Sequence, residues 1–175
     1  MDLSAFYGAF SPACFALLGL WLVAVQIRLP FWEKDPERRR RSYGVALYFA
    51  LPGMMSVFAL IDVQNSLFWR VSFGLVALGG AVVLATVWGW PVPRERDQAG
   101  VRRLPAADWL GLAAYLAAIA LYVLIGVLAV LGGLSALRTE AVLQTLLVFL
   151  GFNVAWLLLL DDRKLPHVRR SAETE

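Results

Sequence analysis

A stripe of polar and aromatic residues runs through one long apolar segment near the end of the chain. Its members are Thr145, Phe149, Phe152, Asn153 and Trp156. Their spacing of four, three, one and three residues holds them on one face of an α-helix. The amide of Asn153 lies deep within the apolar segment and needs hydrogen-bond partners. The stripe therefore predicts either a pore or ligand face with an aromatic constriction, or a hydrogen bond to a neighbouring helix worth on the order of 0.6 kcal/mol.

Polar residues also gather around two short connections between apolar segments. Asp62 and Asn65 lie in the first connection, while Glu140 and Gln144 lie at and just after the end of the second. We predict that these four residues form the outer mouth of a path, where the two carboxylates would attract cations. The alternative is that they are polar because hairpin tips are wet, with Asn65 making the turn.

The other reactive side chains are too few or too far apart to predict catalysis. The only cysteine, Cys14, and the only histidine, His167, lie at opposite ends of the chain, which argues against a shared metal. Asp161 and Asp162 are adjacent but have no second acidic cluster beside them. The common nucleotide-binding, zinc-protease and hydrolase motifs are missing from the sequence. We therefore predict no catalytic residue, no metal, no cofactor and no enzymatic activity.

The elements that must position these residues are five long apolar segments. The chain has 175 residues, of which 60% are hydrophobic and 17% charged, and its mean hydropathy is +0.67. Since a helix of about 20 apolar residues crosses a bilayer, we predict an all-α integral membrane protein with a bundle of five transmembrane helices. The bundle forms one domain over residues 1–162, followed by a polar tail at 163–175. The predicted spans are 5–27, 43–61, 71–90, 109–134 and 141–160.

The distribution of positive charge predicts the orientation. Six lysine or arginine residues lie between spans one and two, four between spans three and four and four in the tail, against one in each other connection. The positive-inside rule then places the N-terminus outside and the C-terminus in the cytoplasm. We expect a multi-pass protein of a bacterial cytoplasmic (inner) membrane. A run of four arginines should contact anionic lipid headgroups, at about 1 kcal/mol per residue, rather than nucleic acid. These are Arg38, Arg39, Arg40 and Arg41.

Two functional interpretations follow, with a third as a minor alternative. The first is a homo-oligomeric channel or passive transporter for an ion or small solute, since small residues such as Ala113, Ala117 and Ala120 would let copies associate. A passive path is favoured because none of the predicted spans contains a charged residue. The second is an accessory subunit of a larger membrane complex, for example an energy-transducing one. The minor alternative is a lipid-processing membrane enzyme.

Overall fold

The computed structural model confirms an all-α chain of five long helices. It describes residues 3–32, 36–61, 66–88, 106–132 and 136–160. The helices are α1 (Leu3–Trp32), α2 (Pro36–Ile61), α3 (Ser66–Trp88), α4 (Ala106–Leu131) and α5 (Ala136–Leu160). All five are long and apolar enough to cross a membrane. The chain is therefore a multi-pass membrane protein.

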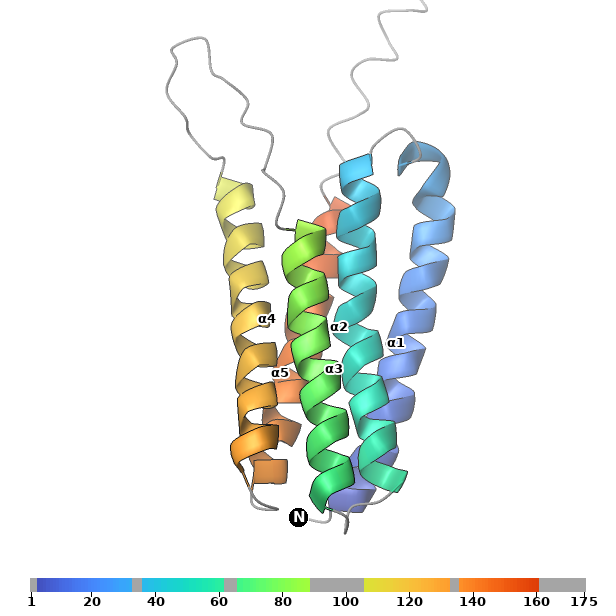
Figure 1. Ribbon diagram of the computed structural model, residues 1–175. Coiled ribbons are helices and arrows are strands. Elements are labelled where there is room, and N and C mark those ends of the chain that lie inside the picture. The colour runs from blue at the N-terminus through green and yellow to red at the C-terminus, as the bar shows by residue number, and fades with distance from the viewer. Residues whose placement is uncertain (1–2, 33–35, 62–65, 89–105, 133–135, 161–175) are drawn as a thin grey trace, which may run out of the picture.

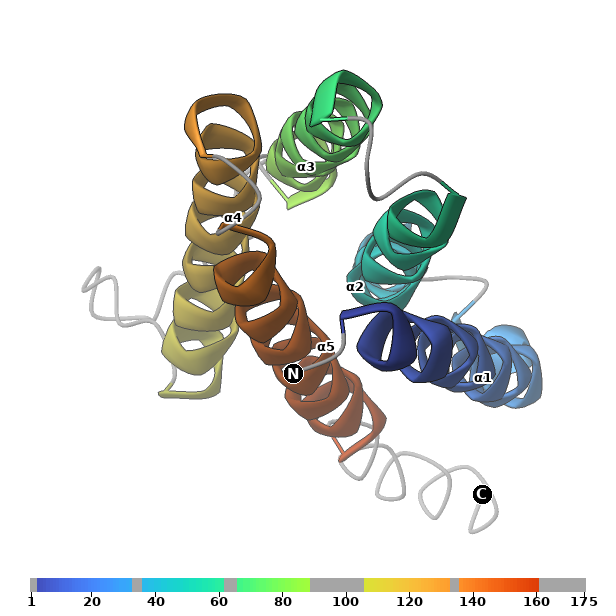
Figure 2. The same ribbon diagram turned by 90° about the horizontal axis from the view of Figure 1, so that it is seen from below.

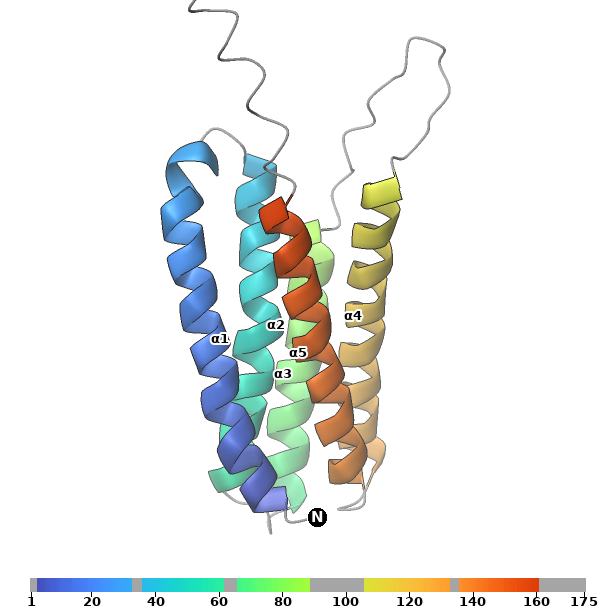
Figure 3. The same ribbon diagram turned by 180° about the vertical axis from the view of Figure 1, so that it is seen from behind.

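The helices stand side by side and alternate in direction (Figure 1). We call the end at which α1, α3 and α5 begin the lower end of the bundle, and the other the upper end. Viewed from below, α1, α2, α3 and α4 follow one another around the bundle, and α5 packs against α4, α2 and α1 (Figure 2). The view from behind shows α5 between α1 and α4 (Figure 3). This order brings the first and last helices together.

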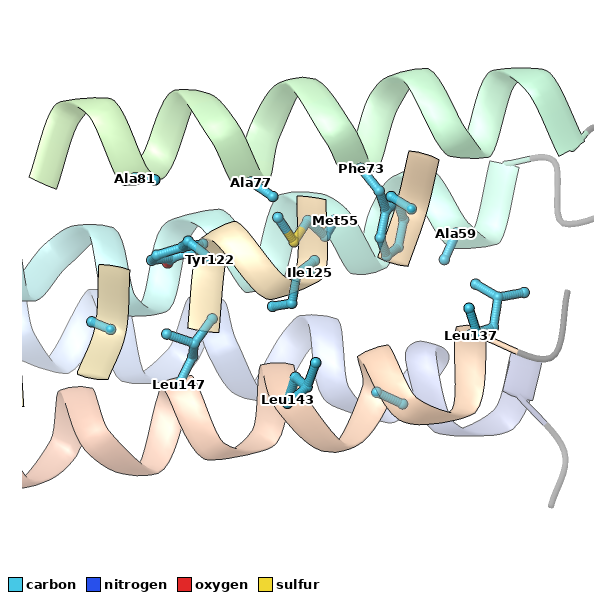
Figure 4. Close-up of a cluster of buried hydrophobic side chains, with 14 of the residues drawn as sticks. Met55, Ala59, Phe73, Ala77, Ala81, Tyr122, Ile125, Leu137, Leu143 and Leu147 are labelled. Carbon is cyan, nitrogen blue, oxygen red and sulfur yellow. The ribbon is translucent and has the colours of Figure 1, made fainter. Parts of the chain in front are cut away.

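A core of apolar side chains fills the space between α2, α3, α4 and α5. Met55, Phe73, Tyr122, Ile125 and Leu147 all lie in it with no exposed surface (Figure 4). Apolar side chains also cover the outside of the bundle, where many of them are exposed. Hydrophobicity around each helix therefore says little about which side faces the core, and close packing decides it.

Two glycines allow close approach of helices to α2. A Cβ on Gly151 of α5 would overlap the Cβ of Tyr48, and a Cβ on Gly53 of α2 would lie 3.2 Å from the Cβ of Cys14 on α1. Small residues on α4 are divided between two sides. Ala118 is buried in the core, whereas Ala117 is exposed on the outer surface together with Ala113 and Ala120.

The helices extend beyond the predicted spans and include charged residues near their ends. Helix α5 begins at Ala136, five residues before the predicted span, and its candidate membrane segment contains Arg138 and Glu140. Arg70 likewise lies within the candidate segment of α3. The predicted boundaries followed the apolar run, but a helix continues for as long as its backbone hydrogen bonds can form, whatever the side chains.

Candidate functional site: a buried polar cluster at the lower end of the bundle

Five buried side chains with polar groups lie inside the lower part of the bundle. We call them the buried polar cluster: Tyr7 of α1, Ser56 of α2, Trp69 of α3, and Glu140 and Gln144 of α5. Tyr7 and Glu140 each lie four residues from the start of their helix, which is about 6 Å along the axis. Because α2 runs in the opposite direction, Ser56 reaches the same region five residues before α2 ends.

The helical repeat explains why α5 contributes two members. Its buried face includes Leu137, Glu140, Gln144, Leu147 and Gly151, at intervals of three and four residues. Glu140 and Gln144 therefore stand one above the other on the side that faces the other helices. Both are completely buried, at 0% exposure.

Hydrogen bonds and ring contacts connect the cluster across helices. The hydroxyl of Tyr7 donates to the backbone carbonyl of Leu137 at 3.3 Å, three residues before Glu140 in the chain. The hydroxyl of Ser56 donates to the carbonyl of Pro52 at 2.7 Å and lies 3.4 Å from Oε1 of Gln144. These hydrogen bonds connect α1 to α5, and α2 to α5, near the carboxylate of Glu140.

Aromatic rings pack beside the polar groups. Trp69 stacks on Phe73 with ring centroids 5.6 Å apart, and Tyr7 meets the same ring edge-on at 6.4 Å. The indole of Trp69 and the phenol of Tyr7 therefore both contact the buried ring of Phe73. The rings add little polarity of their own, so the environment of the cluster is apolar except for its own donors and acceptors.

Four polar atoms of the cluster have no hydrogen-bond partner among the described residues. They are both carboxylate oxygens of Glu140, Nε2 of Gln144 and Nε1 of Trp69. The described arginines at this end are directed elsewhere. Arg70 donates from Nε and Nη2 to the carbonyl of Gly132, at 3.2 and 2.9 Å. Arg138 is exposed. Buried polar groups are normally paired, so four unpaired atoms in one region indicate an interaction beyond the described side chains.

The structure places two residues of the predicted outer mouth inside the bundle. Glu140 and Gln144 do not line a wet surface; they are inside the bundle, because the start of α5 packs against its neighbours. Asp62 and Asn65 lie outside the described residues. Three members of the cluster were missed by sequence reasoning: Tyr7, Ser56 and Trp69. For Tyr7 the available signal was its spacing with Ser11 and Cys14, which places all three on one buried face of α1.

The predicted pore or ligand stripe lies on the outer surface of α5. All five of its side chains are exposed: Thr145, Phe149, Phe152, Asn153 and Trp156. Nδ2 of Asn153 donates to the carbonyl of Phe149 at 2.7 Å, and the hydroxyl of Thr145 donates to that of Ala141 at 2.9 Å. Within this chain the amide of Asn153 thus donates to its own helix. A lining role for the stripe would require a second copy or another protein.

The arginine run lies at the upper end of α2. Arg39 and Arg40 are exposed and Arg41 is half-buried, while the side chain of Arg38 lies outside the described residues. Nη2 of Arg40 donates to the carbonyl of Thr86 on α3 at 2.9 Å. One arginine of the run therefore joins two helices, and binding of lipid headgroups by the run stays a prediction.

Within the described residues, no three His, Cys, Asp or Glu side chains come together. Comparison with protein families, with curated proteins and with solved structures finds no match to this chain. The buried polar cluster is therefore interpreted from its own geometry. It can offer a carboxylate to a positively charged species and two N–H donors to an acceptor.

Proposed function

We propose that this protein is a small membrane transport protein, rather than an enzyme, and that Glu140 binds the cation it transports. The observation that carries the proposal is the complete burial of a carboxylate with no described hydrogen-bond donor to either oxygen. Ionisable residues within membrane helices are costly, and they commonly mark ion or substrate pathways. The sequence favoured a passive path because the predicted spans carry no charge, but the candidate membrane segment of α5 includes Glu140 near its lower end.

Self-association is part of the proposal. Five helices enclose little volume, and this bundle is filled by its own core. The outer stripe of α5 and the exposed small residues of α4 offer surfaces on which copies could pack closely. A homo-oligomer would also give Asn153 and Thr145 a protein environment instead of lipid.

Transport is tested with the purified protein in liposomes under imposed gradients of H⁺, Na⁺ or K⁺. We expect the wild type to carry one of these ions and Glu140→Gln to lower its flux by about tenfold or more, because the amide removes the charge while keeping the shape. Thr139→Val, at the exposed neighbouring position, is the matched control and should keep wild-type flux.

Two results would contradict transport of a cation at Glu140: no flux of any of the three ions, or wild-type flux in Glu140→Gln.

Asn153→Leu distinguishes a path within one bundle from a path between copies. Unchanged flux would place the path within one bundle, whereas lost flux would place it between copies that face each other across α5.

The orientation is proposed from the charge distribution, with the lower end outside the cytoplasm. In a Cys14→Ala background, single cysteines are introduced at Arg138, near the lower end, and at Arg40, near the upper end; both parent side chains are exposed. A membrane-impermeant maleimide added to intact cells should label Arg138→Cys and leave Arg40→Cys unlabelled until the cells are opened. The reverse pattern would show that the lower end is cytoplasmic.

The second candidate function is an accessory subunit of a larger membrane complex. Its specific support is α1, where a Cβ on Gly8 or Gly19 would meet nothing within 4 Å, so another helix could approach closely. The native mass in a mild detergent distinguishes the two. A multiple of 19.3 kDa favours a homo-oligomer, and a particle with other polypeptides favours the subunit.

A further inference from the structure

We propose that the cation taken up by the buried polar cluster is a proton, and that the packed lower end is the protonated form of the protein, with Glu140 as a neutral acid. The inference deepens the proposed function and rests on it for the role of the site, but the identity of the bound ion is argued separately. Its basis is the set of charged groups around Glu140 and the pattern of unpaired donors and acceptors.

Among the described residues, the charged and titratable groups around the carboxylate supply no compensating positive charge. Helix α1 contributes the phenol of Tyr7, which donates to a backbone carbonyl, and α2 contributes only the uncharged Ser56. On α3 the guanidinium of Arg70 is bound to the carbonyl of Gly132, at the end of α4. On α5 itself Arg138 is exposed.

If Glu140 were ionised, its burial would carry the full free-energy cost of desolvation, because no described side chain offers it a counter-charge. A bound proton removes the charge, and it requires no room in a region where Tyr7, Trp69 and Glu140 are already almost completely buried. Neutralisation of the acid is the usual response of an unpaired carboxylate to burial.

The unpaired N–H groups favour a proton over an alkali cation. Na⁺ and K⁺ are bound by oxygen atoms, whereas Nε2 of Gln144 and Nε1 of Trp69 are donors that need an acceptor. A neutral carboxylic acid has one O–H donor and a carbonyl acceptor. The acid can therefore donate within the cluster and also accept from these two groups. A metal cation at the carboxylate would instead face the positive ends of these two N–H dipoles.

Loss of the proton should loosen the lower end. The resulting carboxylate needs water or a counter-charge, and neither is supplied by the described residues around it. The two protonation states of Glu140 therefore favour different packings, so that proton binding shifts the protein between a closed and a more open arrangement of this end.

Infrared spectroscopy of the full-length protein in phosphatidylcholine vesicles tests the proton directly. We expect a protonated carboxylic acid band that is present in the wild type, absent from Glu140→Gln and lost on raising the pH. Subtracting the two spectra removes the other acidic residues, which both proteins share. At fixed pH the band should be unchanged when choline is exchanged for Na⁺ or K⁺. Gln144→Leu should shift its frequency, since a hydrogen-bond donor is removed, and Arg138→Gln should not.

A difference spectrum without this band at any pH would overturn the proposal. The comparison uses wild type and Glu140→Gln that have the same elution volume in size-exclusion chromatography. Displacement of the band by Na⁺ or K⁺ at fixed pH would also overturn it and assign a metal cation to the site. The outcome is separable from the transport test. A band that titrates in a protein without flux would support the proton site and refute transport. Flux of Na⁺ or K⁺ without a band would support transport and refute the proton site.

Discussion

Replacing Gly151 with alanine will destabilise the bundle, although alanine is the better helix former. The added methyl group would overlap the Cβ of Tyr48 on α2 and lie 2.9 Å from its Cγ. A Cβ is fixed to the backbone and cannot rotate away, so α2 and α5 must separate. Alanine gains about 1 kcal/mol from helix propensity, while overpacking costs about 1–3 kcal/mol. With backbone-attached atoms in contact, we expect a net loss of about 2 kcal/mol.

Gly79→Ala is the matched control for this substitution. A Cβ on Gly79 of α3 would meet nothing within 4 Å, so the same chemical change should leave stability unaltered or raise it by up to about 1 kcal/mol. Unfolding by increasing mole fractions of dodecyl sulfate in a mild detergent, followed by circular dichroism, measures both variants. Equal stability of the two would show that α2 and α5 are not in close contact at Tyr48.

Replacing Phe73 with alanine should clearly destabilise the core. Phe73 is 0% exposed, stacks on Trp69 and meets Tyr7 edge-on. In a soluble protein such a truncation costs about 3–5 kcal/mol, partly from transfer to water and partly from the cavity. Because lipid is as apolar as the core, only the packing part applies in a membrane, and we expect a loss of about 2 kcal/mol.

The same truncation on the outer surface provides the control. Phe149 of α5 is 66% exposed and leaves no cavity when shortened, so Phe149→Ala should keep the stability of the wild type in the same dodecyl sulfate titration. Phe73→Ala should in addition disturb the buried polar cluster, because the ring of Phe73 contacts both Trp69 and Tyr7. A shift of the Glu140 carboxylic acid band in Phe73→Ala, with none in Phe149→Ala, would report that disturbance. A larger loss of stability in Phe149→Ala than in Phe73→Ala would show that the face of α3 that carries Phe73 does not lie in the core.

The number and approximate extent of the helices could be predicted from the sequence because they depend on local properties. A run of about 20 apolar residues has to satisfy its backbone internally in lipid, so it becomes a helix whatever lies beside it. The helices are longer than the predicted spans. Helix α5 begins at Ala136, before the predicted span at 141–160, because Arg138 and Glu140 interrupt the apolar run without interrupting the helix.

The sequence by itself therefore determined five membrane-spanning helices and the polar side chains they carry. Only the tertiary structure decided which face of each helix is inside. Asn153 and Glu140 both lie on α5, and the amide was predicted to face protein or water, yet it is Glu140 that lies within the bundle. The physical reason is that each helix is apolar on nearly every side, so hydrophobicity does not orient it. Close packing does: only glycine fits at position 151 against Tyr48, and the face of α5 that carries Gly151 also carries Glu140 and Gln144. Asn153 lies off this face and bonds within its own helix.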